Sequence, residues 1–288
     1  MEDIRVTMAT DAEGRACLAL LPEARGRAVE LLIARSRGVF AGAAAIHWQS
    51  WSKPGGFPLS IHVMPEWRGQ GVGRRLLAAA ADLAAEETDG FWPFLPVAEQ
   101  GVEARFMLAQ GFRLHGRQLY FKARIDGLLD NISPLLARLR RRTGHSNQVE
   151  IQAIPDHLYQ TLGWMVSSEL GGGPQSAAER MRRLAEAPDS KDRSQVAIID
   201  GQAAGVILWR VENGEAIVDG RVVGIPWRGG PINLMLLEAG LLCGKAEGLV
   251  HVNFHCDETV KDTVSLARRA GAERTDTKAT YYYPIPPT

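Results

Sequence analysis

Apolar positions along the chain switch between two spacings, one typical of strands and one typical of helices. An apolar strand, a glycine-containing turn, an amphipathic helix, a second strand, a second helix and a closing strand follow one another, and the series occurs twice. In the first half we expect them at Pro58–Met64, Glu66–Gly73, Arg74–Glu86, Phe91–Val97, Val102–Gln110 and Arg117–Ala123. In the second half we expect them at Ala216–Gly224, Trp227–Gly230, Pro231–Ala246, Leu249–His255, Thr259–Arg269 and Lys278–Tyr283. This alternation predicts a mixed α/β fold.

Recurring landmarks indicate that the two halves are copies of one fold. Trp67–Gly69 recurs as Trp227–Gly229, and the Gly111 that follows a helix recurs as Gly271, both 160 residues later. Upstream, the paired glycines Gly38 and Gly42 recur as Gly201 and Gly205, 163 residues later. Three landmarks in the same order at nearly one offset predict an internal duplication.

The length of 288 residues suits two domains, each large enough to bury its own core. We expect a first domain over residues 1–124, a helical linker over residues 125–147 and a second domain over residues 148–288. The linker is predicted to be helical because apolar residues recur at helical spacing between Leu128 and Leu139.

Composition excludes several classes of protein. Lys and Arg (33) balance Asp and Glu (33), so we expect no nucleic acid partner and no binding to an anionic membrane. The three cysteines are far apart in sequence and form no pair with metal-ligand spacing, which predicts no metal site. The acidic N-terminus lacks the pattern of a secretory signal, and the most apolar helical stretch is too short to span a bilayer. We therefore expect a cytoplasmic protein.

The segment that carries the chemistry is the turn after the strand Pro58–Met64. Gly69, Gly71 and Gly73 alternate there, just before a helix. Glycines let the backbone approach a ligand closely, and free amides at a helix N-terminus bind anions. The alternative is a tight strand-to-helix connection without a ligand, but three alternating glycines are more than a turn needs.

The same segment resembles the signature of a known enzyme superfamily. Arg74 stands where a dinucleotide-binding turn needs its third glycine, so that fingerprint does not fit. Arg68, Gly71 and Gly73 instead fill the fixed positions of the Arg/Gln-x-x-Gly-x-Gly/Ala signature of the GNAT superfamily of acyl-CoA N-acyltransferases. The helix that ends in Gly111-Phe112 is similar to the family's later elements, and the resemblance covers most of residues 1–124.

The resemblance implies two tandem GNAT-like domains, each a mostly antiparallel twisted sheet with flanking helices. It implies transfer of an acyl group, acetyl by default, from acyl-CoA to an amine of a small molecule or peptide, and it allows a homodimer. The residues that it assigns to the pantetheine and pyrophosphate of acetyl-CoA are Val63, Arg68, Gly69, Gln70, Gly71, Val72, Gly73 and Arg74.

In the second copy the signature is damaged. Pro231 replaces Gly71 and has no N–H to offer, and Asn233 replaces Gly73. Because proline suits the first turn of a helix, we expect the fold to survive there. For the same reason we expect Gly71→Pro in the first copy to abolish most cofactor binding while leaving the fold intact. Losing a charge-assisted donor costs about 1.5–3 kcal/mol, so we expect one cofactor per chain.

The acid and base are less clear from the sequence. Family members often place a tyrosine acid four residues before the Gly-Phe, but here Met107 and, in the second copy, Ala267 occupy that position. Candidates for the base are His62, beside Val63, and Glu99, at the end of the next predicted strand. Because side chains alternate along a strand, the sequence leaves open which face His62 occupies.

The missing tyrosine favours a rival hypothesis. A protein that binds acyl-CoA as a sensor or interaction module would keep the anion site and lose the catalytic acid. Release of free CoA that requires an added amine distinguishes the enzyme from such a sensor.

Overall fold

The computed structural model describes residues 4–48, 55–143, 149–170, 173–186 and 193–285. These form two compact units. Unit 1 comprises residues Met1–Gly116 together with Ala279–Thr288, and unit 2 comprises Arg117–Lys278.

Unit 1 is built on one sheet with the strand order β1-β2-β3-β4-β5-β13. Neighbours pair in antiparallel fashion except β4 and β5, which are parallel. The strands are β1 (Ile4–Met8), β2 (Val29–Ser36), β3 (Val39–His47), β4 (Phe57–Val63), β5 (Gly90–Pro93) and the end of β13 (Glu273–Pro284), with the short β6 (Val97–Ala98) beside β13.

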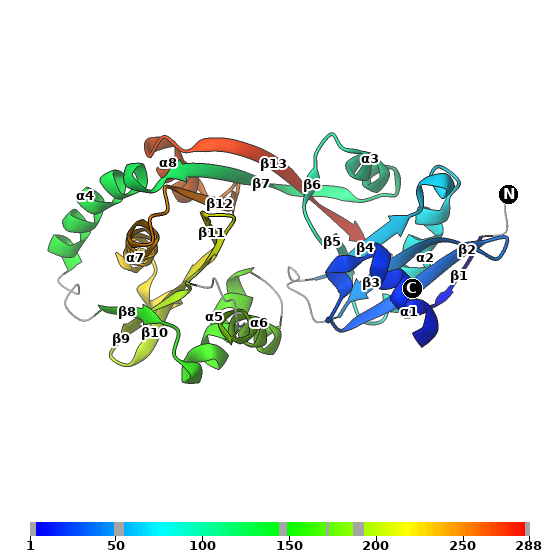
Figure 1. The fold of residues 1–288 in the computed structure, drawn as a ribbon, viewed down its shortest axis with the longest axis horizontal. Helices are drawn as coiled ribbons and strands as arrows, with labels where there is room; N and C mark the ends of the chain where they lie inside the picture. The colour runs from blue at the N-terminus through cyan, green and yellow to red at the C-terminus, as the bar shows by residue number, and fades with distance from the viewer. Residues whose placement is uncertain (1–3, 49–54, 144–148, 171–172, 187–192, 286–288) are drawn as a thin grey trace. The chain divides into compact units, whose positions relative to one another are not determined.

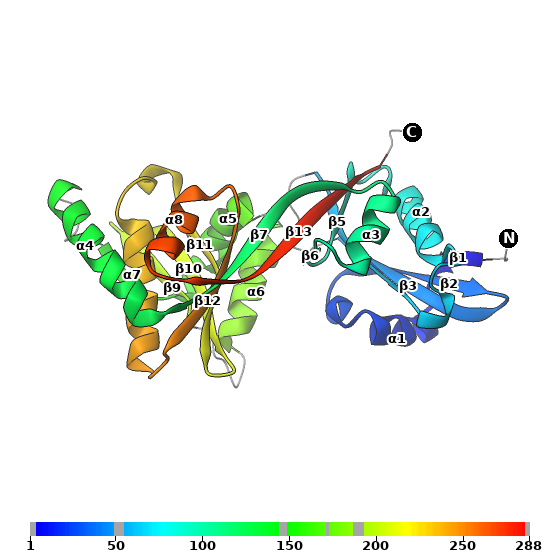
Figure 2. The same cartoon turned by 90° about the horizontal axis from the view of Figure 1, so that it is seen from above.

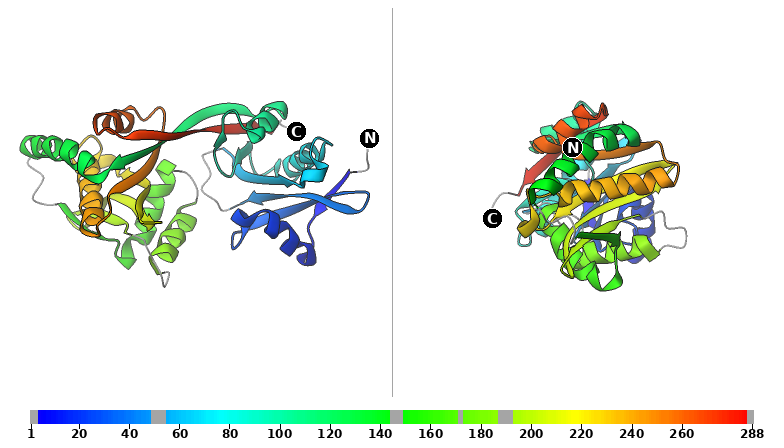
Figure 3. Two further views of the ribbon diagram at one scale, coloured as in Figure 1. Left: turned by 45° about the horizontal axis from the view of Figure 1, so that its top comes forward. Right: turned by 90° about the vertical axis from the view of Figure 1, so that its left-hand side faces the viewer.

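Helices cover both faces of this sheet. Helix α2 (Val72–Ala84) lies on one face and α1 (Asp11–Leu20) on the other (Figure 3, left). The side chains of α2 pack with those of β2, β3 and β4 in the main core of the unit. The remaining helical segments are α3 (Val102–Ala109) and the short 3₁₀ turns η1 (Pro22–Ala24) and η2 (Pro65–Trp67).

Unit 2 repeats this plan. Its strand order is β8-β9-β10-β11-β12-β7, with β11 and β12 parallel. Helix α7 covers one face, and α5 and α6 lie on the other (Figure 1). The strands are β8 (Val149–Ala153), β9 (Gln195–Ile199), β10 (Gln202–Glu212), β11 (Glu215–Val223), β12 (His251–Asp257) and β7 (Arg113–Arg124). The helices are α4 (Ile125–Thr143), α5 (Tyr159–Leu170), α6 (Pro174–Glu186), α7 (Ile232–Ala246) and α8 (Lys261–Arg269), with 3₁₀ turns η4 (Asp156–Leu158) and η5 (Ile225–Trp227).

The two copies exchange their last strands. Strand β7 ends the first copy in sequence but pairs with β12 of unit 2, from Gln118↔Asp257 to Arg124↔His251. Strand β13 ends the second copy but pairs with β5 of unit 1, through Tyr283↔Phe91. The two exchanged strands are themselves neighbours in the sheet (Figure 2). The compact units are therefore not the continuous stretches 1–124 and 148–288 that we expected.

The predicted α/β class and the mostly antiparallel sheets are confirmed. The helix expected at 125–147 is α4, whose Leu128, Ile132 and Leu136 are buried in the core of unit 2, so it is an integral part of that unit. Residues 144–147 of the expected linker lie outside the described ranges. The strand expected over Phe91–Val97 is two short strands, β5 and β6.

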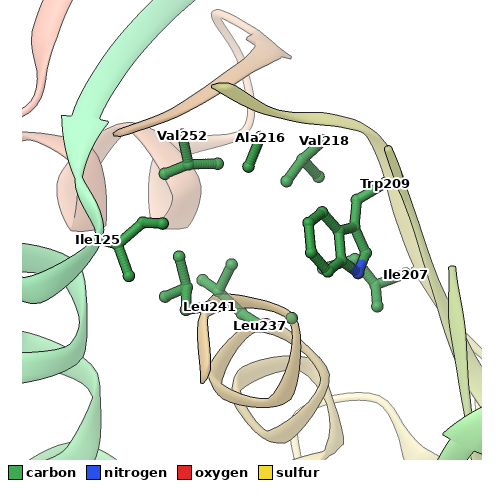
Figure 4. A pocket seen from close by; sticks show the side chains of 9 residues that line it. Ile125, Ile207, Trp209, Ala216, Val218, Leu237, Leu241 and Val252 are labelled. Atoms are coloured by element: carbon green, nitrogen blue, oxygen red, sulfur yellow. The ribbon is translucent and has the colours of Figure 1, made fainter. Parts of the chain in front are cut away.

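A small apolar cavity lies in the core of unit 2, between α7 and the sheet (Figure 4). Trp209 occupies the position of Ile46 in the first copy, and Gly240 on α7 occupies that of Ala80. A Cβ on Gly240 would lie 3.5 Å from Trp209 Nε1, so a larger side chain on the strand is matched by a smaller one on the helix. The cavity measures about 10 Å³, close to one water, and its lining is almost wholly apolar, so we assign it no ligand.

Among the helices of the described residues, none is both long enough and apolar enough to cross a membrane.

Candidate functional site

The candidate site begins where β4 separates from β5. The two strands pair from Phe57↔Phe91 to Leu59↔Pro93, and the last bond between them is Phe94 N–H to the Leu59 carbonyl oxygen at 3.2 Å. Beyond Leu59, β4 continues to Val63 beside β3 alone. One edge of β4 is therefore open over its last residues.

The backbone groups on that open edge can be identified. Met64 N–H donates to the Ala41 carbonyl of β3, at 3.0 Å. Because backbone groups alternate in direction along a strand, His62 also faces β3, whereas Ile61 and Val63 face the side that β5 has left. The open edge therefore presents both backbone groups of Ile61 and the N–H of Val63.

The turn after β4 is fastened by the arginine of the signature. Arg68 Nε donates to the Val63 carbonyl oxygen at 3.2 Å, and Trp67 N–H donates to the Met64 carbonyl at 2.9 Å. Gln70 Nε2 donates to the Glu66 carbonyl at 2.8 Å. The Arg68 side chain therefore holds the turn against the strand end.

Gly71 is the N-cap of α2 and has a φ of +88°, in the left-handed region. Proline fixes φ near −65°, so the expectation that Gly71→Pro would leave the fold intact is wrong. The backbone N–H groups of Gln70, Gly71 and Arg74 donate to no backbone acceptor within the described part of the chain. Orphan amides at a helix N-terminus form an anion site.

Two exposed guanidinium groups accompany these amides. Arg74 Nη2 would lie 3.9 Å from a Cβ on Gly71, so the Arg74 side chain lies beside the loop. Arg74 and Arg75 are both exposed, and neither makes an ion pair with another described residue. Arg75 was not among the residues predicted from the sequence. Comparison of the two copies could have identified it, because Leu234 and Met235 replace the two arginines in the second copy.

Gly73 has a different role from Gly71. It is buried, and a Cβ on it would lie 2.9 Å from Phe106 Cε2 of α3 and 3.5 Å from Val63 Cγ2. The lack of a side chain at this position therefore lets α2 pack against α3. Gly73 thus has a packing role that the sequence did not predict, and its contact with a ligand stays a prediction.

The second copy keeps the turn and loses the anion site. Arg228 Nε donates to the Val223 carbonyl at 3.2 Å, as Arg68 does in the first copy. However, Gly230 N–H donates to the Trp227 carbonyl at 3.4 Å and Leu234 N–H to the Pro231 carbonyl at 3.0 Å.

The second copy has also lost the positive charge of the loop. The guanidinium of Arg228 forms an ion pair with Glu169 of α5. Leu234 and Met235 carry no charge where Arg74 and Arg75 stand in the first copy. The N–H groups of Gly230 and Leu234 are hydrogen-bonded, and the charge of Arg228 is paired. The second turn therefore offers few groups that could bind a phosphate.

The face of β4 on which His62 lies is now settled. Leu59, Ile61 and Val63 pack in the core beneath α2. Side chains alternate, so Ser60 and His62 lie on the opposite face, where α1 packs over β3. His62 is partly exposed there, opposite Ala43 of β3.

A buried histidine on the same face was not predicted from the sequence. His47 of β3 is fully buried, lies 3.1 Å from Ser60 Oγ through Nε2, and stacks on Phe94 at 4.4 Å between ring centres. Its Nδ1 finds no partner within the described residues. Burial, and then the nearby charge of Arg27, lower the pKa of His47 to about 4. The ring is therefore neutral at pH 7 and too weak a base to accept an ammonium proton.

Two further predicted positions lie around α3. Glu99 follows β6 in the turn that leads into α3, and is only partly exposed. Met107 of α3 packs against the core of unit 1, and its counterpart Ala267 in α8 is buried. No group of three potential metal ligands gathers in the portion of the chain described here, and the absence of a metal stays a prediction.

Comparison with known proteins bears on this arrangement. The family model of the GNAT acetyltransferases matches residues 3–112, which include β4, the glycine turn, α2 and α3. Residues 3–112 of this chain are thus similar to the GNAT acetyltransferase family. A search of curated protein sequences gives no match.

Solved structures extend the fold to the whole chain. A GCN5-related N-acetyltransferase from Sphaerobacter thermophilus is 16% identical with a TM-score of 0.60, covering 99% of this chain and 96% of its own. A tandem GNAT protein from the clavulanic acid biosynthesis pathway is 16% identical with a TM-score of 0.60, covering 99% and 100%. A GCN5-related N-acetyltransferase from Anabaena variabilis is 11% identical with a TM-score of 0.67, covering 98% and 73%. The tandem GNAT fold is thus shared over the full length.

The packing of Gly73 against Phe106 can be tested by a double-mutant cycle. Gly73→Ala should lower the free energy of unfolding by about 1–3 kcal/mol, because the new methyl group overlaps the Phe106 ring. Phe106→Leu in the same chain should recover part of that loss, since Leu266 stands at this position beside Asn233 in the second copy. Denaturant unfolding of the four proteins gives the coupling energy. Strictly additive effects would show that the two residues do not pack together.

His47 predicts a specific pH dependence of stability. The pKa of about 4 in the folded protein lies below the ordinary value of 6.5, so the unfolded chain takes up a proton first as pH falls. The stabilising contribution is full above pH 6.5 and is lost as pH falls toward 4, by about 3 kcal/mol in all. His47→Gln should flatten the unfolding free energy in this window relative to wild type. Equal slopes for the two proteins would contradict the buried neutral ring.

Proposed function

We propose that the protein transfers an acetyl group from acetyl-CoA to an amine of a small molecule or peptide, at a single site in unit 1. The observation that supports this best is the contrast between the two turns. The first turn has unpaired backbone amides and two exposed arginines. In the second turn, amides donate to backbone carbonyls and the two arginines are replaced by uncharged residues. The acyl donor is acetyl-CoA by analogy with the family, and a cytoplasmic location and a homodimer remain predictions.

The donor would be held along one continuous path. The amides of Gln70, Gly71 and Arg74, with the Arg74 guanidinium, suit the pyrophosphate. The open edge of β4 at Ile61 and Val63 offers backbone groups to the amides of pantetheine, as an added strand would. The two subsites are joined by the turn that Arg68 fastens to Val63.

The acceptor amine would approach from the opposite face of β4. His62 lies on that face, beside the open edge, and an imidazole can act as a base at neutral pH. His62 would take the ammonium proton, after which the amine nitrogen bonds to the acyl carbon and the carbon–sulfur bond breaks. Met107 has no proton to give, so a water would carry the proton that the attacking nitrogen still has to lose to the departing thiolate.

Met107 also favours the second candidate function, an acyl-CoA sensor without turnover. Calorimetric titration should give one acetyl-CoA per chain, because only the first turn retains its donors. Incubation with a panel of primary amines should then release free CoA, detected by a thiol reagent. Binding without amine-dependent release would favour the sensor, and two equivalent sites would refute the loss of the second site.

His62→Ala tests the base. Only on the order of one in a thousand molecules of an amine with pKa near 10 is neutral at pH 7, so a base has much to recover. The variant should lower turnover by on the order of 10²–10⁴-fold while the calorimetric affinity for acetyl-CoA changes little. The loss should shrink as pH rises and more amine is already neutral. Full turnover at neutral pH would exclude His62 and leave Glu99 or a water as the base.

A further inference from the structure

The strand that closes the sheet of unit 1 is supplied by the second copy. Tyr283 pairs with Phe91 and Pro284 with Gly90, and Ile285 N–H donates to the Asp89 carbonyl at 2.9 Å. Strand β5 has only four residues, and β13 covers the edge that faces away from β4. A strand this short depends on its neighbours on both sides.

Side chains of β13 contact unit 1 on both faces of its sheet. Tyr281 is buried in the core beneath α2, and the Tyr283 ring lies 5.1 Å from that of Phe112. On the other face, the Tyr282 ring lies 4.8 Å from that of Trp92 at a tilt of 45°, and its hydroxyl donates to the Gly55 carbonyl at 2.9 Å. The end of β13 is therefore a core element of unit 1.

These contacts lead to the candidate acyl-CoA site by two routes. Strand β5 forms one side of the opening at the end of β4, and β13 holds β5 by backbone pairing. Phe112, which Tyr283 contacts, directly follows α3, and Phe106 of α3 packs on Gly73 in the turn. Loss of β13 would therefore loosen both β5, beside the open edge of β4, and α3, which packs on the turn.

The other end of β13 is held in unit 2. Residues 273–278 belong to that unit, and Lys278 Nζ lies 4.9 Å from the ring centre of Tyr120 on β7. Strand β7 pairs with β12 over seven residue pairs, which ties it to the core of unit 2. The stability of unit 2 therefore bears on how firmly β13 is anchored.

We propose that the second copy, having lost its own anion site, functions by holding the strand that completes the acyl-CoA site of the first. The proposal rests on the proposed function for the identity of the ligand. When only a fraction of molecules has β13 in place, the apparent dissociation constant rises by the inverse of that fraction. By linkage, bound ligand also stabilises the strand.

Hydrogen exchange of the full chain, with and without saturating acetyl-CoA, measures this coupling. We expect slower exchange at the start of α2 and also at residues 281–285, with no change in the β8–β9 pair of unit 2. Protection of the turn without protection of 281–285 would overturn the inference. No protection at either place, together with no heat in calorimetry, would instead refute the proposed function.

Variants then test whether unit 2 provides the anchor. Leu136 of α4 is fully buried in the core of unit 2, so Leu136→Ala should speed exchange at 281–285 and weaken acetyl-CoA binding. Leu136→Met, which conserves volume, is the matched control. Faster exchange throughout unit 2 with unchanged exchange at 281–285 and unchanged affinity would contradict the proposal.

A local pair of variants isolates the contact with Phe112. Tyr283→Ala removes the aromatic pair and should raise the dissociation constant of acetyl-CoA roughly two- to tenfold. Tyr283→Phe keeps the ring and should bind as wild type does. If Tyr283→Ala fails to fold, the exchange experiment on the wild-type chain still decides. Equal affinities for a folded Tyr283→Ala and Tyr283→Phe would show that this contact does not reach the site.

Discussion

The pairing of each copy's last strand within the other unit is the constraint that shapes the rest of the molecule. Strand β13 closes the sheet of unit 1 beside β5, and β7 closes that of unit 2 beside β12. Each unit thereby buries residues that the other copy encodes, as Tyr281 shows in the core of unit 1. Neither half of the sequence contains a complete sheet, so changes in one copy are expected to affect the other.

Comparison of the two turns separates the residues that shape the turn from those that bind. The bond from the arginine Nε to a valine carbonyl measures 3.2 Å in both copies, through Arg68 and Arg228. The Trp-Arg-Gly segment forms the same turn in both copies. The free amides after this segment and the pair Arg74 and Arg75, to which we assign binding, differ between the copies. A signature can therefore contain a structural part and a ligand part that are lost independently.

The sequence predicted the fold class, the duplication and most elements to within a few residues, because periodicity and turn residues report local structure. It did not predict the strand exchange, since pairing partners of a strand such as β13 are non-local. The cofactor site at the glycine turn stays a prediction. The packing of Gly73 against Phe106 was missed, because a packing glycine and a binding glycine look alike in sequence. His47 was missed for the same kind of reason, as its burial and its contact with Ser60 depend on three strands coming together.

The second turn differs from the first at several independent positions. No single substitution would restore all the amide donors and charges of the first turn. A glycine at Pro231 would return one N–H, worth about 1.5–3 kcal/mol toward a charged oxygen. The amides of Gly230 and Leu234 would still donate to the backbone, and Glu169 would still pair with Arg228. Yet the core of this unit is packed apart from a cavity of about 10 Å³, with Gly240 accommodating Trp209. Unit 2 therefore keeps an ordered core although its turn has lost its donors and charges. These properties fit the proposed role of unit 2, which is to hold β13 against unit 1.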